Sequence, residues 1–151
     1  MDEREYDGTS IEHMMNPRNY GRIEDADGQG IGKNPTNGEM VIVYLSIEGE
    51  RIVDIRFQAK ACMTAIVAGS IFTETIKGST VEKAREMADL MLQKLESMPL
   101  QEVAACSEMV AEAFLAALEH YEARRKDPDT PVPTRMISRS CPTTNQEGED
   151  G

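Results

Sequence analysis

Residues 53–76 read VDIRFQAKACMTAIVAGSIFTETI, and this stretch decides the fold. In residues 53–59 apolar side chains alternate with polar ones, which is the pattern of a strand with one buried face. Beyond Cys62, apolar residues recur at helical spacing, and Gly78 stands where that helix is expected to stop. Cys62 is therefore predicted to lie where a strand ends and a helix begins. The strand residues expected to face the helices are Val53, Ile55 and Phe57.

The predicted position of Cys62 favours a reactive thiol. The N-terminus of a helix carries partial positive charge from unsatisfied amides, which stabilises a thiolate, the form that binds a metal or attacks sulfur. Cys106 also precedes a predicted helix, which we expect to follow a linker over residues 99–105 and to end at residues 124–126. Taken singly, each cysteine is more typical of a small core residue. Two thiols at two helix starts indicate a shared chemistry.

The flanking sequence predicts a hairpin, a second helix and a long loop. Residues 40–47 are rich in Val, Ile and Tyr and form a predicted strand, which a turn at residues 48–50 joins to the next strand. Ser79-Thr80-Val81-Glu82 is predicted to be a capping box that opens the next helix, whose buried residues are expected to be Val81, Ala84, Ala88, Met91, Leu92 and Leu95. Residues 19–38 hold many Gly, Asp and Asn residues, so we expect a long loop with a functional role.

The composition fits one ordinary globular domain. The formal net charge of −11 disfavours nucleic acid and anionic membranes as partners. The cysteines are odd in number and widely spaced, which argues against a disulfide framework, and no signal or membrane segment is evident, so we expect a cytoplasmic protein. A single domain is predicted over residues 1–126, with a loose N-terminus at residues 1–9. Residues 127–151 are predicted to be a disordered tail that contains Cys141.

Four motifs follow one another between residues 13 and 121. They are HMMNPRNYG at residues 13–21, GKNPTNGE at 32–39, DIRF at 54–57 with ACMTAI at 61–66, and Cys106-Ser107 with the helix to Tyr121. In order and spacing they resemble the iron–sulfur cluster assembly scaffold family, of the IscU type or NifU N-terminal domain. The resemblance implies an α+β fold in which a small antiparallel β-sheet packs against several α-helices, with a site formed by three loops at one end.

In that family the site holds three cysteines, an acidic residue beside the first cysteine and a histidine just before the third. The resemblance places these positions, in chain order, at Asn37, Glu39, Cys62, Ala105 and Cys106. It therefore implies a metal site of Cys62, Cys106 and Glu39. Asn37 and Ala105 supply neither the thiolate nor the imidazole that the family has there.

Three arrangements would complete such a site. Two protomers could each donate Cys62 and Cys106 to one bridging cluster, which gives a homodimer and needs no missing ligand. Cys141 could instead return as a third thiol, although an exposed thiol without a role is the simpler interpretation of that residue. A single iron or zinc ion could also bind Cys62, Cys106 and Glu39, with water in the fourth position.

By resemblance, the protein is expected to be a scaffold and not an enzyme. It would receive sulfur from a cysteine desulfurase, hold a 2Fe–2S or 4Fe–4S cluster transiently, and pass it to apo acceptor proteins. A second hypothesis is a protein that kept the fold and regulates a desulfurase, or that uses zinc in a sulfur relay, without assembling clusters.

The two histidines and the methionines are expected to lie outside the site. The resemblance places His13 in an N-terminal helix as a partner-surface residue. His120 has no evident partner in the sequence and is expected to be solvated. Three of the ten methionines fit helical core positions. They are Met87, Met91 and Met109.

Overall fold

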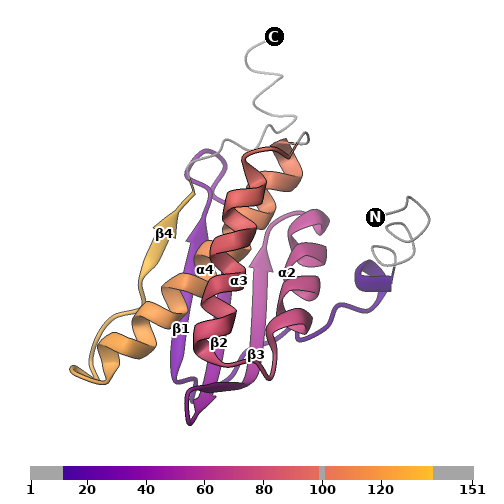
Figure 1. Cartoon of the computed structure of the whole chain (residues 1–151). Coiled ribbons are helices and arrows are strands. Elements are labelled where there is room, and N and C mark those ends of the chain that lie inside the picture. The colour runs from indigo at the N-terminus through magenta and orange to yellow at the C-terminus, as the bar shows by residue number, and fades with distance from the viewer. Residues whose placement is uncertain (1–11, 99–100, 138–151) are drawn as a thin grey trace.

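The sheet of the protein has four strands in the order β3-β2-β1-β4 (Figure 1). The computed structural model describes residues 12–98 and 101–137. Within them the strands are β1 (Gly28–Lys33), β2 (Met40–Glu48), β3 (Arg51–Lys60) and β4 (Thr134–Met136). The long helices are α2 (Met63–Ile76), α3 (Val81–Leu95) and α4 (Gln101–Arg124). The expected α+β class is confirmed, but the sheet is mixed because β4 runs parallel to β1 while the other pairs are antiparallel.

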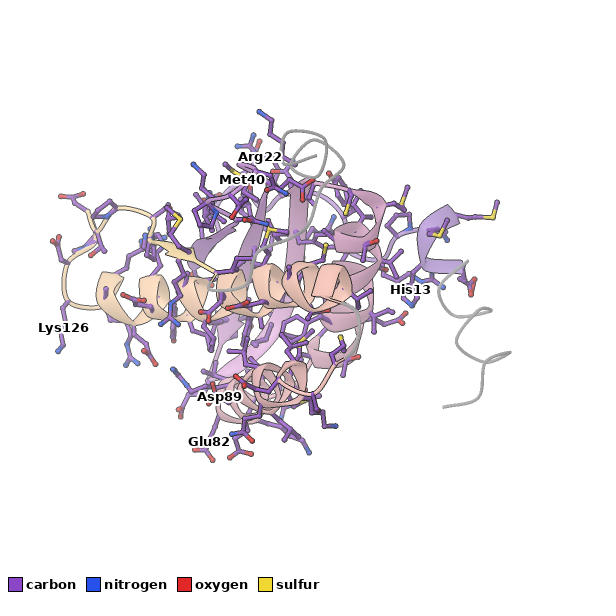
Figure 2. All side chains as sticks on the ribbon, turned by 90° about the horizontal axis from the view of Figure 1, so that it is seen from above. His13, Arg22, Met40, Glu82, Asp89 and Lys126 are labelled. Atoms are coloured by element: carbon purple, nitrogen blue, oxygen red, sulfur yellow. The ribbon has the colours of Figure 1, made fainter. Side chains whose placement is uncertain are left out.

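The three long helices lie on one side of the sheet. α4 packs along β1 and β2, α2 packs on β3 and α4, and α3 packs on α4. Seen from above, Met40 of the sheet and Glu82 of α3 lie on opposite sides of α4 (Figure 2). α4 is therefore the central layer, which explains why its side chains are buried nearly all round. Strands and α4 both contribute fully buried side chains to the core, among them Val41, Val43, Leu45, Phe114 and Leu118.

The hairpin of β2 and β3 forms as predicted, but the alternation of buried and exposed residues along β3 is interrupted near its start. Ser46 lies opposite Asp54 and Ile47 lies opposite Ile52, so Val53 is the additional residue of a β-bulge. As a result Ile52 is fully buried and Val53 is 41% exposed. The prediction that Val53 shares a face with Ile55 and Phe57 is therefore wrong at Val53, because simple alternation does not allow for the extra residue.

β1 lies inside the segment that the composition predicts to be a loop. Its three glycines alternate along the strand and turn toward α4. A Cβ atom added to Gly28, Gly30 or Gly32 would lie 2.2–2.3 Å from main-chain atoms of α4. The glycines are therefore needed because the helix backbone lies directly against the strand backbone. The prediction of one long loop over residues 19–38 is wrong for this reason.

The helix starts differ in part from those predicted. Cys62 is the N-cap of α2, as expected. The N-cap of α3 is Thr80, whose hydroxyl accepts a hydrogen bond from the Lys83 N–H at 3.1 Å, and not Ser79. α4 already includes Gln101, so Cys106 lies in the second turn of that helix and not at its start. The linker predicted over residues 99–105 is wrong for residues 101–105, which are helical, while residues 99–100 lie outside the described residues.

The chain after α4 returns to the sheet as β4. Gly32 lies opposite Arg135, whose guanidinium donates hydrogen bonds to Glu112 at 3.0 Å and to Glu119 at 3.3 Å on α4. Burial alone would lower the pKa of Arg135, but these two carboxylates raise it above its ordinary value. Ile137 follows the strand and is 4% exposed. Disorder beginning at residue 127 is therefore not observed over residues 127–137, because pairing and burial hold them.

His120 anchors the chain segment between α4 and β4 by hydrogen bonds. Its Nδ1 accepts a hydrogen bond from the Gln29 N–H at 3.0 Å, so Nε2 carries the proton and donates to the Thr130 carbonyl at 2.9 Å. The residue is only 5% exposed, so the expectation of a solvated histidine without a partner is wrong. Both partners are main-chain groups, 91 and 10 residues away in sequence, and no pattern indicates them.

The outer edge of β3 is covered at two points. The main-chain N–H and carbonyl of Ile52 bond to residues 78–79 at 2.9 and 2.8 Å. Those of Phe57 bond to residues 19–21 at 3.0 and 2.8 Å, and the Tyr20 ring packs edge-on against the Phe57 ring. The segment before β1 therefore covers part of the outer edge of β3.

Candidate metal centre

Cys62 and Cys106 lie side by side although 44 residues separate them. Their Sγ atoms are 3.7 Å apart, and both residues are thiols. Cys62 is half-buried at the junction of β3 and α2, whereas Cys106 is fully buried within α4. The sequence therefore indicates the pairing correctly. In the structure the pairing arises because α4 runs along β1 and its second turn reaches the end of the sheet at which β3 passes into α2, and not because Cys106 begins a helix.

The distance between the two sulfurs fits joint binding of one metal ion. A zinc ion lies about 2.3 Å from each thiolate in a tetrahedral site, which places two such sulfurs roughly 3.8 Å apart. A disulfide would instead need a separation of about 2.05 Å. The observed 3.7 Å is close to the separation of two sulfurs on one metal ion, and it is also that of a contact between two thiols.

The family's first ligand position lies in the tight loop between β1 and β2. Asn37 Oδ1 accepts a hydrogen bond from the Glu39 N–H at 2.9 Å, and Asn34 Oδ1 accepts one from the Thr36 N–H at 2.9 Å. The Asn37 oxygen therefore already accepts a hydrogen bond from the backbone, and the other group of this amide, Nδ2, is a hydrogen-bond donor. At the family's histidine position, Ala105 is fully buried and offers no donor atom to a metal.

This loop contains three buried polar atoms without a hydrogen-bond partner among the described residues. They are Asn34 Nδ2, Asn37 Nδ2 and Glu39 Oε1. Such atoms are uncommon, since burial without a partner is unfavourable by about 1–3 kcal/mol. The sequence contains no sign of them, because burial depends on the packing around the loop.

The structure brings the two cysteines together but does not complete a metal site. Over residues 12–98 and 101–137 it contains no group of three His, Cys, Asp or Glu side chains that could hold a metal ion. Metal binding by Glu39 therefore stays a prediction. The predicted alternative ligand, Cys141, lies outside the described residues.

His13 has a structural contact and lies against α2. Its Nδ1 lies 2.5 Å from the Ser70 hydroxyl, its Nε2 lies 3.7 Å from Glu74, and the residue is 5% exposed. His13 therefore joins the N-terminal helical turn to α2. The expectation of a surface histidine is wrong, whereas its neighbours Met14 and Met15 are exposed.

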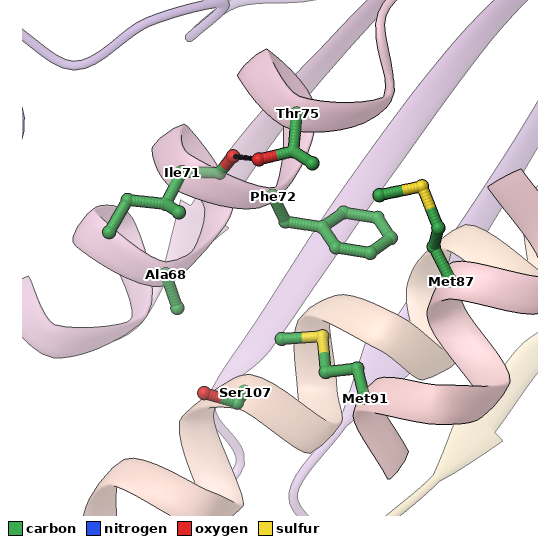
Figure 3. Close-up of a pocket in the computed structure, with 7 residues that line it drawn as sticks. All are labelled: Ala68, Ile71, Phe72, Thr75, Met87, Met91 and Ser107. Carbon is green, nitrogen blue, oxygen red and sulfur yellow. Dashed lines mark hydrogen bonds between the residues drawn. The ribbon is translucent and has the colours of Figure 1, made fainter. Parts of the chain in front are cut away.

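An apolar cavity of about 290 Å³ lies between α2, α3 and α4. Met87 of α3 points toward Phe72 of α2 across it, and Ser107 closes it from α4 (Figure 3). The core roles expected for the methionines are confirmed, since Met87 and Met91 pack against the core and Met109 is fully buried.

The sequence of the chain is similar to those of known proteins. Residues 5–128 match the model of the family described as NifU-like N terminal domain. The chain is 38% identical over 117 residues to an Archaeoglobus fulgidus protein named iron-sulfur cluster assembly scaffold protein IscU 1, covering 77% of this chain and 76% of that protein. It is 29% identical over 126 residues to the Escherichia coli protein named iron-sulfur cluster assembly scaffold protein IscU, covering 80% of this chain and 97% of that protein.

Solved structures show the same fold. The N-terminal NifU-like protein of Brucella abortus superimposes with a TM-score of 0.60 at 18% identity, covering 79% of this chain and 95% of the other. Among the residues that the structure describes, no helix is both long and apolar enough to cross a membrane.

Proposed function

The chain belongs to the NifU-like N-terminal domain family, and we propose that it acts as a scaffold in iron–sulfur cluster assembly. The observation that carries the proposal is the separation of 3.7 Å between the sulfurs of Cys62 and Cys106. Two thiolates at this distance can bind the same iron atom of a cluster. The cluster is cargo here, so the site has to hold it and also release it.

The position of each thiol suits one of these tasks. Cys106 is fully buried in a long helix, so its sulfur is held in a fixed place. Cys62 is half-buried at a helix N-cap, and its side chain makes no cap hydrogen bond, so its sulfur is not engaged by the helix backbone. The partial positive charge of the α2 N-terminus favours its thiolate. Glu39 is proposed as an auxiliary ligand or a release element on the neighbouring loop.

The proposed partners follow from the cargo. Sulfur would come from a cysteine desulfurase, and the assembled 2Fe–2S or 4Fe–4S cluster would pass to apo acceptor proteins. This role requires binding and exchange and no general base of the protein's own, so we propose a scaffold without enzymatic activity. We propose the cytoplasm as its compartment, since a reducing environment keeps closely spaced thiols reduced.

A second candidate is a desulfurase regulator or a zinc-dependent sulfur relay without cluster assembly. Asn37 and Ala105 favour it, because neither residue supplies the thiolate or imidazole that the resemblance places there. Two thiolates alone are also fewer than the four that iron–sulfur clusters commonly use. The two candidates differ in what the paired thiols bind, which is an iron–sulfur cluster in the first and zinc or nothing in the second. An experiment can therefore distinguish them.

The test is anaerobic reconstitution with iron and sulfide, reading iron and sulfide per chain and the visible spectrum. Cys62→Ser is the informative variant, since serine is a good N-cap and the fold should survive. Met63→Leu is its matched control, because it removes a neighbouring exposed sulfur and keeps both thiols. We expect Cys62→Ser to lose iron and sulfide by at least about tenfold, with Met63→Leu unchanged.

Three results would count against this function. Iron and sulfide retained in Cys62→Ser would contradict it directly. A wild-type chain that holds stoichiometric zinc but gains no charge-transfer bands would favour the second candidate. Desulfurase binding that is the same in wild type and Cys62→Ser, without any cluster in either, would favour a regulator.

A further inference from the structure

A second cavity adjoins the one between α2, α3 and α4. The first has a volume of about 290 Å³, and the second, of about 330 Å³, lies toward the C-terminal end of α3. Three residues line both cavities, so the two meet at these side chains. They are Met87, Met91 and Ser107. Each volume is near the lower end of the range for ligand pockets, which is about 300–1,000 Å³. One elongated ligand could therefore extend through both.

Apolar side chains form most of the lining of both cavities. Met87 and Met91 of α3 point across the first cavity toward α2 (Figure 3). Methionine side chains are flexible and adapt to the shape of a ligand. On the α2 side Ile71 is 36% exposed, and on the α3 side Leu90 is 50% exposed, so solvent reaches the lining. The other apolar residues are Ala68, Phe72, Leu95 and Met98. This lining suits the apolar body of a ligand.

Ser107 is a buried polar residue without a partner, and it lies where the two cavities meet. It is 7% exposed, and its hydroxyl forms no hydrogen bond to any residue that the structure describes. A hydroxyl inside a helix commonly bonds to the carbonyl four residues earlier. Thr75, the other hydroxyl of the first cavity, does so, since it donates to the Ile71 carbonyl at 2.8 Å (Figure 3). The Ser107 hydroxyl is therefore left to bond a ligand.

Lys94 brings a positive charge to the second cavity, which Ser107 also lines. Within the described part of the chain, Lys94 is the only charged residue that lines either cavity, and its ammonium forms no ion pair there. An unpaired cation is notable in a chain with 27 acidic and 16 basic residues. A carboxylate accepts hydrogen bonds from an ammonium and from a hydroxyl. The two polar groups of the second cavity therefore suit a carboxylate.

We propose that the two cavities bind a carboxylate with an unbranched apolar chain, that is, a molecule of the fatty-acid class. The carboxylate accepts hydrogen bonds from Lys94 and Ser107 in the second cavity. The chain passes Met87 and Met91 and enters the first cavity toward α2. Ser107 follows Cys106 in the sequence, so the ligand lies beside the turn of α4 that carries the buried thiol. The site uses neither thiol, so this inference goes beyond the proposed function and does not depend on it.

The experiment titrates the full chain with decanoate and follows isotope-labelled methionine methyl groups by NMR. The signals of Met87, Met91 and Met98 should shift, because these residues line the cavities. The signal of Met15, which is 81% exposed and lines neither cavity, should stay in place. The dissociation constant should fall by roughly fourfold for each methylene added between octanoate and decanoate, as suits a buried chain.

Two substitutions test the polar end of the site. Lys94→Gln and Ser107→Ala should each weaken decanoate binding by about fivefold, because each removes one hydrogen bond to the carboxylate. Lys83→Gln is the matched control, since Lys83 is an exposed lysine of α3 that lines neither cavity. Without ligand, Ser107→Ala should leave the melting temperature unchanged, because its hydroxyl has no described partner to lose. Decylammonium, which has the same chain and the opposite charge, should bind at least about tenfold more weakly than decanoate.

A third substitution tests the apolar end of the site. Ala68→Leu places a larger apolar side chain in the first cavity. It should remove the gain in affinity from octanoate to decanoate, because the end of the longer chain no longer fits. Filling a cavity usually stabilises a protein, so the melting temperature should not fall. An unchanged melting temperature then shows that the lost gain in affinity does not come from unfolding.

Four results would overturn this proposal. In the first, decanoate shifts none of the three methionine signals of the lining. In the second, Lys94→Gln binds decanoate as tightly as wild type, which would show that the carboxylate is not recognised. In the third, decylammonium binds as tightly as decanoate, which would indicate apolar partition alone. In the fourth, the same signals shift when the protein concentration is raised without decanoate, which would show that a second copy of the chain covers the cavities instead.

Discussion

Replacing Gly30 by alanine tests the close contact between β1 and α4 most directly. The added Cβ atom would lie 2.2 Å from the Ala117 nitrogen, 2.5 Å from the Ala113 carbonyl oxygen and 2.6 Å from the Ala116 carbonyl carbon. All three are main-chain atoms of one helix, so no side-chain rotation can relieve the overlap. To restore an ordinary contact of about 3.4 Å, α4 would have to move away from β1 by roughly 1 Å. A gap of that size between packed atoms loses a quarter to a half of their dispersion energy.

This displacement sets the magnitude of the expected effect. Overpacking a core lowers the free energy of unfolding by about 1–3 kcal/mol. We expect the loss in Gly30→Ala to reach or exceed the upper end of this range, because α4 contacts β1 along the whole length of the strand. For a domain of this size that lowers the melting temperature by about 10 °C.

The assay is thermal and urea unfolding followed by circular dichroism, with Gly49→Ala in the β2–β3 turn as the control. Gly49 has a φ of +54° and nothing within 4 Å of an added Cβ, so its substitution should cost only about 1–2 kcal/mol of backbone strain. If Gly30→Ala unfolds at the same urea concentration as Gly49→Ala, the direct backbone contact is wrong.

Two further predictions concern the local structure around β3 and α3. Thr80→Ala should lower the free energy of unfolding by about 1 kcal/mol because it removes the N-cap of α3, while Ser79→Ala should change it by less than half as much. Urea unfolding of the two variants side by side checks this, and a larger effect at Ser79 would restore the capping box of the sequence pattern. Ile52→Ala should cost about 2–5 kcal/mol, whereas Val53→Ser at the exposed bulge position should stay within about 0.5 kcal/mol. Equal losses at both positions in the same denaturation assay would argue against the bulge.

The elements with a clear period could be predicted from the sequence. The β2–β3 hairpin, α2 and α3 each follow a repeat of apolar residues, and their observed bounds agree with that repeat. β1 could not be found in this way, because its buried face carries glycines and the pattern therefore has no apolar member. β4 and His120 were missed because their stability depends on partners distant in sequence.

The candidate site was predictable only as far as its two cysteines. The pairing of Cys62 with Cys106 follows from the resemblance and is confirmed by the sulfur–sulfur distance. The reason expected for Cys106 was incorrect, since α4 starts before it and buries it.

The covered edge of β3 has a consequence for how this protein meets others. A sheet with a free edge can recruit a strand from another chain, which is a route to aggregation and also a common mode of peptide recognition. Here main-chain groups of Ile52 and Phe57 on that edge are already bonded to residues 78–79 and 19–21, and the opposite edge strand is only three residues long. Strand addition is thereby disfavoured on both sides. If the protein acts as proposed, its partners would recognise helices and loops, and the end of the molecule that holds the thiols would be where they receive the cluster.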